Sequence, residues 1–133
     1  MGRGDVIFER MLPWHTLKDQ GYKTTPETLK DRHRSDCHAW GAHPMYHYFA
    51  SILGIRSADF GFRKVIIRPL PGYLKNAGGI AVHPSGMIKT SFEFEGKRLR
   101  SSVTLPRGIT GILEWRGRRI ALLPSETRGN DPG

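Results

Sequence analysis

The chain has 133 residues and carries 21 lysines and arginines against 12 aspartates and glutamates, which gives a formal net charge of +9. This length suits about one domain with one hydrophobic core. The single cysteine, Cys37, excludes an intramolecular disulfide and a zinc site built from cysteines, and no apolar run approaches the roughly 18 residues of a membrane span.

The first predicted element is an amphipathic helix over residues 5–20. Apolar side chains fall close to one of its faces: Val6, Ile7, Met11, Trp14 and Leu17. Asp5 occupies the expected N-cap, and Gly21 is suited to end the helix. Pro13 removes one backbone donor, so we expect a bend or break near it. Charged residues interrupt every apolar run here, which excludes a secretory pattern and favours a cytoplasmic location.

Residues 21–35 are predicted to form a loop, and a second helix follows that runs to about Leu53. Pro44 suits the first turn of this helix, and Gly54 suits its end. Apolar residues repeat along it at helical spacing: Met45, Tyr48, Phe49, Ile52 and Leu53. Asp36 is a reasonable N-cap for helical turns before Pro44, although the sequence leaves open whether such turns exist.

From Gly61 onward the pattern is that of short strands separated by turns. The predicted strands cover residues 65–67, 77–82, 87–95, 99–105, 109–115 and 119–123. The third alternates most clearly, with one face made of Ile88, Thr90, Phe92 and Phe94. Strands of this length and spacing predict an antiparallel β-sandwich. Residues 125–133 have the composition of a disordered tail.

Titratable and aromatic residues are concentrated in residues 34–44, and such density is typical of a functional site. A metal site is one option, because His43 and His47 are four residues apart. The glutamate of the His-Glu-x-x-His motif is missing, however, so we expect no metal and no cofactor. Cys37 and His38 are a weak candidate for a nucleophile and its base, since adjacent side chains seldom face each other.

Sugar chemistry is the third option for this region. Glycoside hydrolysis needs two carboxyl groups that flank the bond, and Glu27 and Asp36 are the carboxylates available nearby. Glu27 is equally compatible with an ordinary solvated charge in a loop. Side chains suited to bind a sugar are also present: Trp14, Trp40, Tyr46, His38 and His43.

The sequence of residues 34–44, Arg-Ser-Asp-Cys-His-Ala-Trp-Gly-Ala-His-Pro, closely resembles a segment near the end of the catalytic domain in bacterial α-L-rhamnosidases, glycoside hydrolase family 78. Residues 21–27 are similar to the loop of this family that ends in a glutamate. Residues 53–56 and 61–69 are similar to its passage into a C-terminal β-sandwich. The resemblance extends from about Trp14 to Leu123.

This resemblance implies an α+β chain with three parts. Residues 1–58 would be the terminal helices and active-site loop of an (α/α)6 catalytic barrel, residues 59–124 a C-terminal β-sandwich, and residues 125–133 the tail. The family removes terminal α-L-rhamnose with inversion, a mechanism in which a general base activates water. The resemblance assigns that role to Glu27. It places His38 at the sugar, with the neighbouring side chains of Trp40, His43 and Trp14.

The general acid of the family lies upstream of the part that this chain resembles. One carboxylate cannot both protonate the leaving oxygen and activate water on the opposite face. We therefore expect the chain alone to be inactive, as a C-terminal fragment, a truncated gene product or one part of a split enzyme. Its expected partners are rhamnose-containing carbohydrate and either the missing N-terminal part or a second copy, with no membrane.

Two other readings of the sequence remain open. The first is a non-catalytic accessory β-sandwich module that supports or binds carbohydrate. The second is a basic nucleic-acid-binding module, which only the net charge of +9 suggests. If the second reading is right, affinity for nucleic acid should fall steeply as the salt concentration rises.

Overall fold

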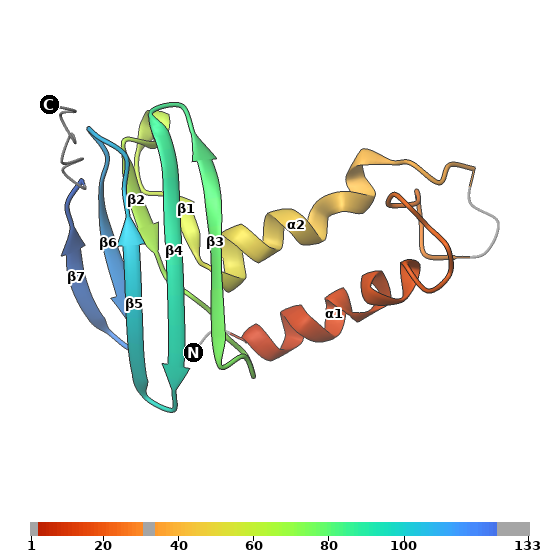
Figure 1. Cartoon of the computed structure of the whole chain (residues 1–133), viewed down its shortest axis with the longest axis horizontal. Coiled ribbons are helices and arrows are strands. Elements are labelled where there is room, and N and C mark those ends of the chain that lie inside the picture. The colour runs from red at the N-terminus through yellow and green to blue at the C-terminus, as the bar shows by residue number, and fades with distance from the viewer. Residues whose placement is uncertain (1–2, 31–33, 125–133) are drawn as a thin grey trace, which may run out of the picture.

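The computed structural model describes residues 3–30 and 34–124 of the chain. Figure 1 shows two β-sheets facing each other and two helical segments that project from one side of them. The combination of helices with a largely antiparallel sandwich was predicted. That the helices end an (α/α)6 barrel stays a prediction, and the predicted tail at residues 125–133 lies outside the described residues.

Helix α1 spans Gly4–Leu17. The predicted cap is wrong by two positions, because the N-cap is Arg3 and Asp5 lies in the first turn. There its carboxylate accepts a hydrogen bond of 3.0 Å from Nη2 of Arg3 and suits the positive end of the helix dipole. Of the predicted bend or break at Pro13, the break is wrong, since the helix continues past this residue. The fixed φ of proline is compatible with a helix, although its ring removes one backbone hydrogen bond and crowds the carbonyl four residues before it.

The end of α1 agrees with the expected role of Gly21. Its φ is 87°, and its N–H donates to the carbonyl of Lys18 at 3.0 Å. The next N–H, that of Tyr22, donates to the carbonyl of Leu17 at 3.0 Å. These two bonds form a Schellman motif, in which glycine adopts the left-handed conformation at low cost.

The second helical segment consists of three short pieces. They are a 3-10 turn η1 (Ala39–Ala42), helix α2 (His43–His47) and a π-helical turn η2 (Tyr48–Ile52). Pro44 lies in the first turn of α2, as predicted. Turns before Pro44 therefore exist, but the residue that precedes them is His38, so Asp36 does not cap them.

Gly54 ends this segment for a steric reason. Its φ is 71°, and a Cβ at this position would lie 2.0 Å from the carbonyl oxygen of Arg68. The N–H of Arg68 also donates to the carbonyl of Gly54 at 3.0 Å. The helical segment can therefore turn directly into the sandwich only because this residue has no side chain.

One sheet has the order β1-β2-β6-β7 and the other the order β3-β4-β5. The strands of the first are β1 (Ile55–Ser57), β2 (Lys64–Ile67), β6 (Thr110–Trp115) and β7 (Arg118–Leu122). Those of the second are β3 (Asn76–His83), β4 (Gly86–Glu95) and β5 (Arg98–Thr104).

The expectation of purely antiparallel pairing is wrong at one place. Strands β2 and β6 are parallel, in a register that runs from Lys64 opposite Thr110 to Ile67 opposite Leu113. Parallel neighbours need a long connection, and here the whole second sheet lies between them in the sequence. Turn residues in the sequence indicate only which consecutive strands form hairpins. They therefore gave no indication of the pairing between β2 and β6.

The hairpins follow the sequence closely. In β4 the predicted inner side chains are buried and the intervening ones are exposed. Trp115 is paired with Arg118, so the last turn consists of Arg116 and Gly117 alone. Both have positive φ, 49° and 82°, which is the requirement of a type I′ turn. Strand β7 therefore begins at Arg118, one residue before the predicted start at residue 119.

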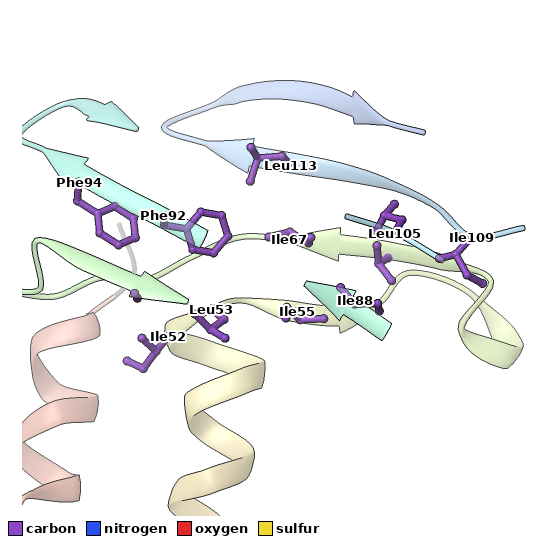
Figure 2. Close-up of a cluster of buried hydrophobic side chains, with 12 residues drawn as sticks. Ile52, Leu53, Ile55, Ile67, Ile88, Phe92, Phe94, Leu105, Ile109 and Leu113 are labelled. Carbon is purple, nitrogen blue, oxygen red and sulfur yellow. The ribbon is translucent and has the colours of Figure 1, made fainter. Parts of the chain in front are cut away.

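The core lies between the two sheets and includes the end of the helical segment (Figure 2). Ile52 and Leu53 are 0% exposed and pack with Phe92 and Ile67. At the other end of the same apolar face Met45 is 70% exposed. This apolar face therefore packs on the sandwich only at its C-terminal end.

The start of α1 is also fixed to the sandwich. A Cβ on Gly4 would lie 2.6 Å from the carbonyl oxygen of Leu70, and the rings of Phe8 and Tyr73 are 4.8 Å apart. Both helical segments are thus anchored at one end, and the loop that joins them lies at the far end from the sheets (Figure 1). None of the helices among the described residues is long and apolar enough to cross a bilayer.

Candidate functional site

Two stretches of the loop at the far end of the helices are tied together by backbone hydrogen bonds. The N–H of His38 donates to the carbonyl of Thr25 at 2.8 Å, and the N–H of Glu27 donates to that of Ser35 at 2.9 Å. The hydroxyl of Thr25 donates in turn to the carbonyl of His38 at 3.1 Å. The hydroxyl of Thr24 donates to the carbonyl of Asp36. This ladder holds Glu27 and His38 on neighbouring stretches of chain.

A close approach between η1 and the loop explains the glycine of the Trp-Gly-Ala sequence. A Cβ on Gly41 would lie 2.4 Å from the carbonyl oxygen of Pro26. Gly41 is buried, as is Pro26. Any larger residue would therefore push η1 away from the stretch that carries Glu27.

The carboxylate of Glu27 is largely covered and is paired with Arg34. Its side chain is 11% exposed, and its Oε1 accepts a hydrogen bond of 2.9 Å from Nη2 of Arg34. The N–H of Arg34 adds a longer bond of 3.3 Å to Oε2. The side-chain bond from Arg34 lowers the pKa of Glu27, burial opposes this, and the backbone bond and the charge of His38 assist it. Glu27 is therefore held in its ionised form.

Aromatic side chains lie next to the backbone of Glu27. The rings of His38 and Trp40 are 3.8 Å apart between centroids, at an interplanar angle of 37°. Nε1 of Trp40 donates to the backbone carbonyl of Glu27 at 2.8 Å, while the residue as a whole is 61% exposed. Nδ1 of His38 is buried and has no hydrogen-bond partner among the described residues. An exposed indole and an unpaired imidazole nitrogen thus lie beside Glu27.

Trp14 and His43 support the turn from behind. Nε1 of Trp14 donates to the carbonyl of Gly41 at 2.7 Å. Its ring meets that of His43 edge to face at 4.8 Å. Nδ1 of His43 lies 3.0 Å from the carbonyl oxygen of Trp40. Because these polar atoms are already paired with the backbone of η1, the visible role of both side chains is to position the turn.

The structure thus brings Glu27, His38 and Trp40 together and links Trp14 and His43 to them through η1. Sequence reasoning missed Arg34 as the partner of Glu27. Arg34 belongs to a run of charged residues, and nothing in that run shows which cation reaches the carboxylate.

The other chemistries considered from sequence have little support in the geometry. Cys37 is exposed. The rings of His43 and His47 are 5.9 Å apart. Among the described ranges no group of three or more histidine, cysteine, aspartate and glutamate side chains is arranged to hold a metal ion.

Comparisons with known proteins agree with one another. Residues 54–122 match the family model described as the bacterial alpha-L-rhamnosidase C-terminal domain. Solved structures with similar folds include a GH78 family rhamnosidase of Bacillus sp. GL1, with 29% identity, a TM-score of 0.63, and coverage of 80% of this chain and 14% of that one. No match was found among curated protein sequences.

Two further solved structures extend the likeness. Native alfa-L-rhamnosidase from Aspergillus terreus has 19% identity and a TM-score of 0.66 over 82% of this chain and 14% of that one. Streptomyces avermitilis alpha-L-rhamnosidase, solved with L-rhamnose, has 24% identity and a TM-score of 0.62. The match covers 75% of this chain and 11% of that one. The present chain thus spans between 11% and 14% of the length of these three proteins. The similarity reaches beyond the sandwich into the helical part.

Proposed function

Because the chain belongs to the bacterial alpha-L-rhamnosidase C-terminal domain family, we propose that it is the C-terminal portion of an α-L-rhamnosidase that hydrolyses terminal α-L-rhamnose from glycosides with inversion. Residues up to about 58 end the catalytic domain in this proposal, and the sandwich follows. The observation that supports it best is the placement of an ionised, largely covered Glu27 beside His38 and Trp40.

Glu27 is the general base of the proposed reaction. A base must be ionised when the substrate binds, and the lowered pKa of Glu27 meets this condition. A carboxylate with a low pKa is also a weak proton acceptor. Arg34, whose side chain is 88% exposed, is free of packing that would hold it, so it can move away when a sugar and a water molecule approach. Loss of the pair would then raise the basicity of Glu27.

His38 and Trp40 contact the sugar in this proposal. The unpaired Nδ1 of His38 is suited to a hydroxyl of rhamnose, because a buried nitrogen gains from a partner that water cannot supply. The exposed indole of Trp40 offers an apolar surface to a sugar ring. Trp14 and His43 hold η1 in place and in this way position the residues that contact the sugar. Their own contribution to sugar binding is therefore indirect.

A general acid is required in addition to Glu27, because an inverting reaction uses two carboxyl groups on opposite sides of the bond. The general acid of the resembled family lies upstream of the part that this chain covers. We therefore assign the acid to the remainder of the catalytic domain. The chain acts only when that remainder completes the barrel around the loop.

A chimera tests this proposal. Residues 3–124 would replace the corresponding end of the Bacillus sp. GL1 rhamnosidase, and the unmodified chain would serve as the control. We expect the chimera, but not the chain alone, to hydrolyse an aryl α-L-rhamnoside and to release β-L-rhamnose first, as followed by proton NMR. First release of the α-anomer would contradict the inverting assignment, and turnover by the chain alone would contradict the assignment of the acid.

A further inference from the structure

A basic groove lies at the opposite end of the molecule from the loop of Glu27. It runs between the start of β5 and the β6–β7 hairpin, two parts that belong to different sheets (Figure 1). Its apolar floor is formed by side chains such as Leu99 and Leu113. Nothing in the proposed reaction uses this groove.

Trp115 fixes the groove by joining its two sides. Its Nε1 donates to the backbone carbonyl of Lys97 at 3.0 Å, and its ring lies 5.6 Å from that of Phe94 between centroids. The first contact links β6 to the turn before β5, and the second links it to the end of β4. The two walls are therefore held in place before any ligand binds, which lowers the entropic cost of binding.

The charge of the groove is strongly one-sided. Five cationic side chains line it: Lys97, Arg98, Arg100, Arg116 and Arg118. Glu95 is the one carboxylate among the same lining residues. Arg100 makes a long contact of 3.7 Å with Glu93, where both side chains are mostly exposed. Such pairs neutralise little charge.

Four of these cations have no carboxylate partner within the described part of the chain: Lys97, Arg98, Arg116 and Arg118. A concave surface lined by charges of one sign attracts counter-ions more strongly than isolated charges do. Guanidinium groups also match the two oxygens of a carboxylate in a bidentate geometry. The groove therefore fits a ligand that carries several carboxylates.

We propose that this groove binds an acidic oligosaccharide through the carboxylates of its uronate units. The inference rests on the proposed function and narrows its substrate class to rhamnose-containing polysaccharides with acidic sugars. A single-stranded nucleic acid fits less well, because its binding relies on aromatic platforms for the bases. Trp115 is the one tryptophan among the lining residues. Its ring nitrogen donates to the backbone carbonyl of Lys97, and the guanidinium of Arg116 lies over its ring, 5.6 Å from the centroid.

The test is a binding titration of the full chain with hexagalacturonate at low ionic strength, with neutral maltohexaose and a thymidine oligonucleotide as comparison ligands. The variant Arg98→Gln/Arg118→Gln removes two cations of the groove. The variant Lys89→Gln/Arg107→Gln removes the same charge from exposed positions outside it. We expect hexagalacturonate to bind, maltohexaose not to bind, and the groove variant to weaken binding by about tenfold or more, since each 1.4 kcal/mol of lost contact is tenfold in affinity.

The control variant should change the affinity for hexagalacturonate less than threefold. Equal loss in both variants would overturn the proposal in favour of general charge attraction. Tighter binding of the oligonucleotide would overturn it in favour of nucleic acid. Absence of binding to hexagalacturonate would also overturn it and would leave the rhamnosidase assignment intact, because the aryl rhamnoside of that assay has no carboxylate.

Discussion

Nη2 of Arg34 lies 2.9 Å from Oε1 of Glu27, and the two side chains are 88% and 11% exposed. An exposed cation is thus paired with a largely covered carboxylate. The pair lowers the pKa of Glu27 and engages Oε1 of its carboxylate. Arg34 therefore sets the basicity of the proposed base.

Arg34→Gln should raise the pKa of Glu27 toward its ordinary value, because it removes the largest cause of the lowered pKa. The measurement is a carbon-13 NMR titration of the glutamate carboxyls. Arg10→Gln, an exposed change on α1, is the control and should leave this titration unchanged. An unaltered Glu27 titration in Arg34→Gln would show that the pair is absent in solution.

The same pair makes stability depend on pH. The folded-state pKa of Glu27 lies below the unfolded value, so its contribution to stability is full above the ordinary glutamate range. It is lost as the pH falls through the lowered folded-state pKa. Urea unfolding from neutral to acidic pH should therefore show a smaller loss of stability in Arg34→Gln than in the unmodified chain. Identical pH profiles would contradict this linkage.

Gly54→Ala should destabilise the fold by about 3 kcal/mol, since it combines a strained φ with a close backbone contact. The new Cβ would lie 2.0 Å from the carbonyl oxygen of Arg68. Gly21→Ala is the matched control, because its φ is also positive but nothing lies within 4 Å of the added atom. Its cost should be about 1 kcal/mol, from strain alone. Equal losses in chemical denaturation would rule out the steric account of Gly54.

Ile52→Ala should cost ~2–5 kcal/mol, the usual range for a buried isoleucine. Ile52 is 0% exposed in the sandwich core, whereas Met45 on the same helical face is 70% exposed. Met45→Ala should therefore change stability by less than about 0.5 kcal/mol. The free energies of unfolding from urea titrations measure both. A small effect of Ile52→Ala would mean that the helical end is not part of the core.

Trp14→Phe separates a positioning role from direct contact with sugar. It removes the hydrogen bond to the carbonyl of Gly41 and keeps most of the ring, so we expect a loss of about 1 kcal/mol in stability. In the chimera, kcat should fall with little change in KM, because η1 no longer holds its place. Increased KM with unchanged stability would instead indicate that Trp14 contacts the substrate.

Local features of the fold could be predicted from the sequence, and long-range ones could not. The alternation in β4 and the stop at Gly21 depend on neighbouring residues, and both are confirmed. The short strand β1 was missed, because Arg56 and Ser57 are polar and exposed in it. The parallel pairing of β2 with β6 was missed because residues far apart in sequence determine it.

The candidate site shows the same division. The density of polar and aromatic residues in 34–44 indicated a site, and the structure places His38 and Trp40 beside Glu27. The pairing of Glu27 with Arg34 depends on how the loop folds back, which no spacing rule predicts. The family resemblance gave Glu27 its proposed role, and that role stays a prediction.

The most direct test of the proposed chemistry is the turnover of an aryl α-L-rhamnoside by the chimera and by two of its variants. Glu27→Gln should lower kcat by roughly 10²–10⁴-fold, the contribution typical of a general base. Asp36→Asn, in the same loop, should change kcat less than threefold. Full activity in Glu27→Gln, or a large loss only in Asp36→Asn, would contradict the assignment of Glu27 as the base.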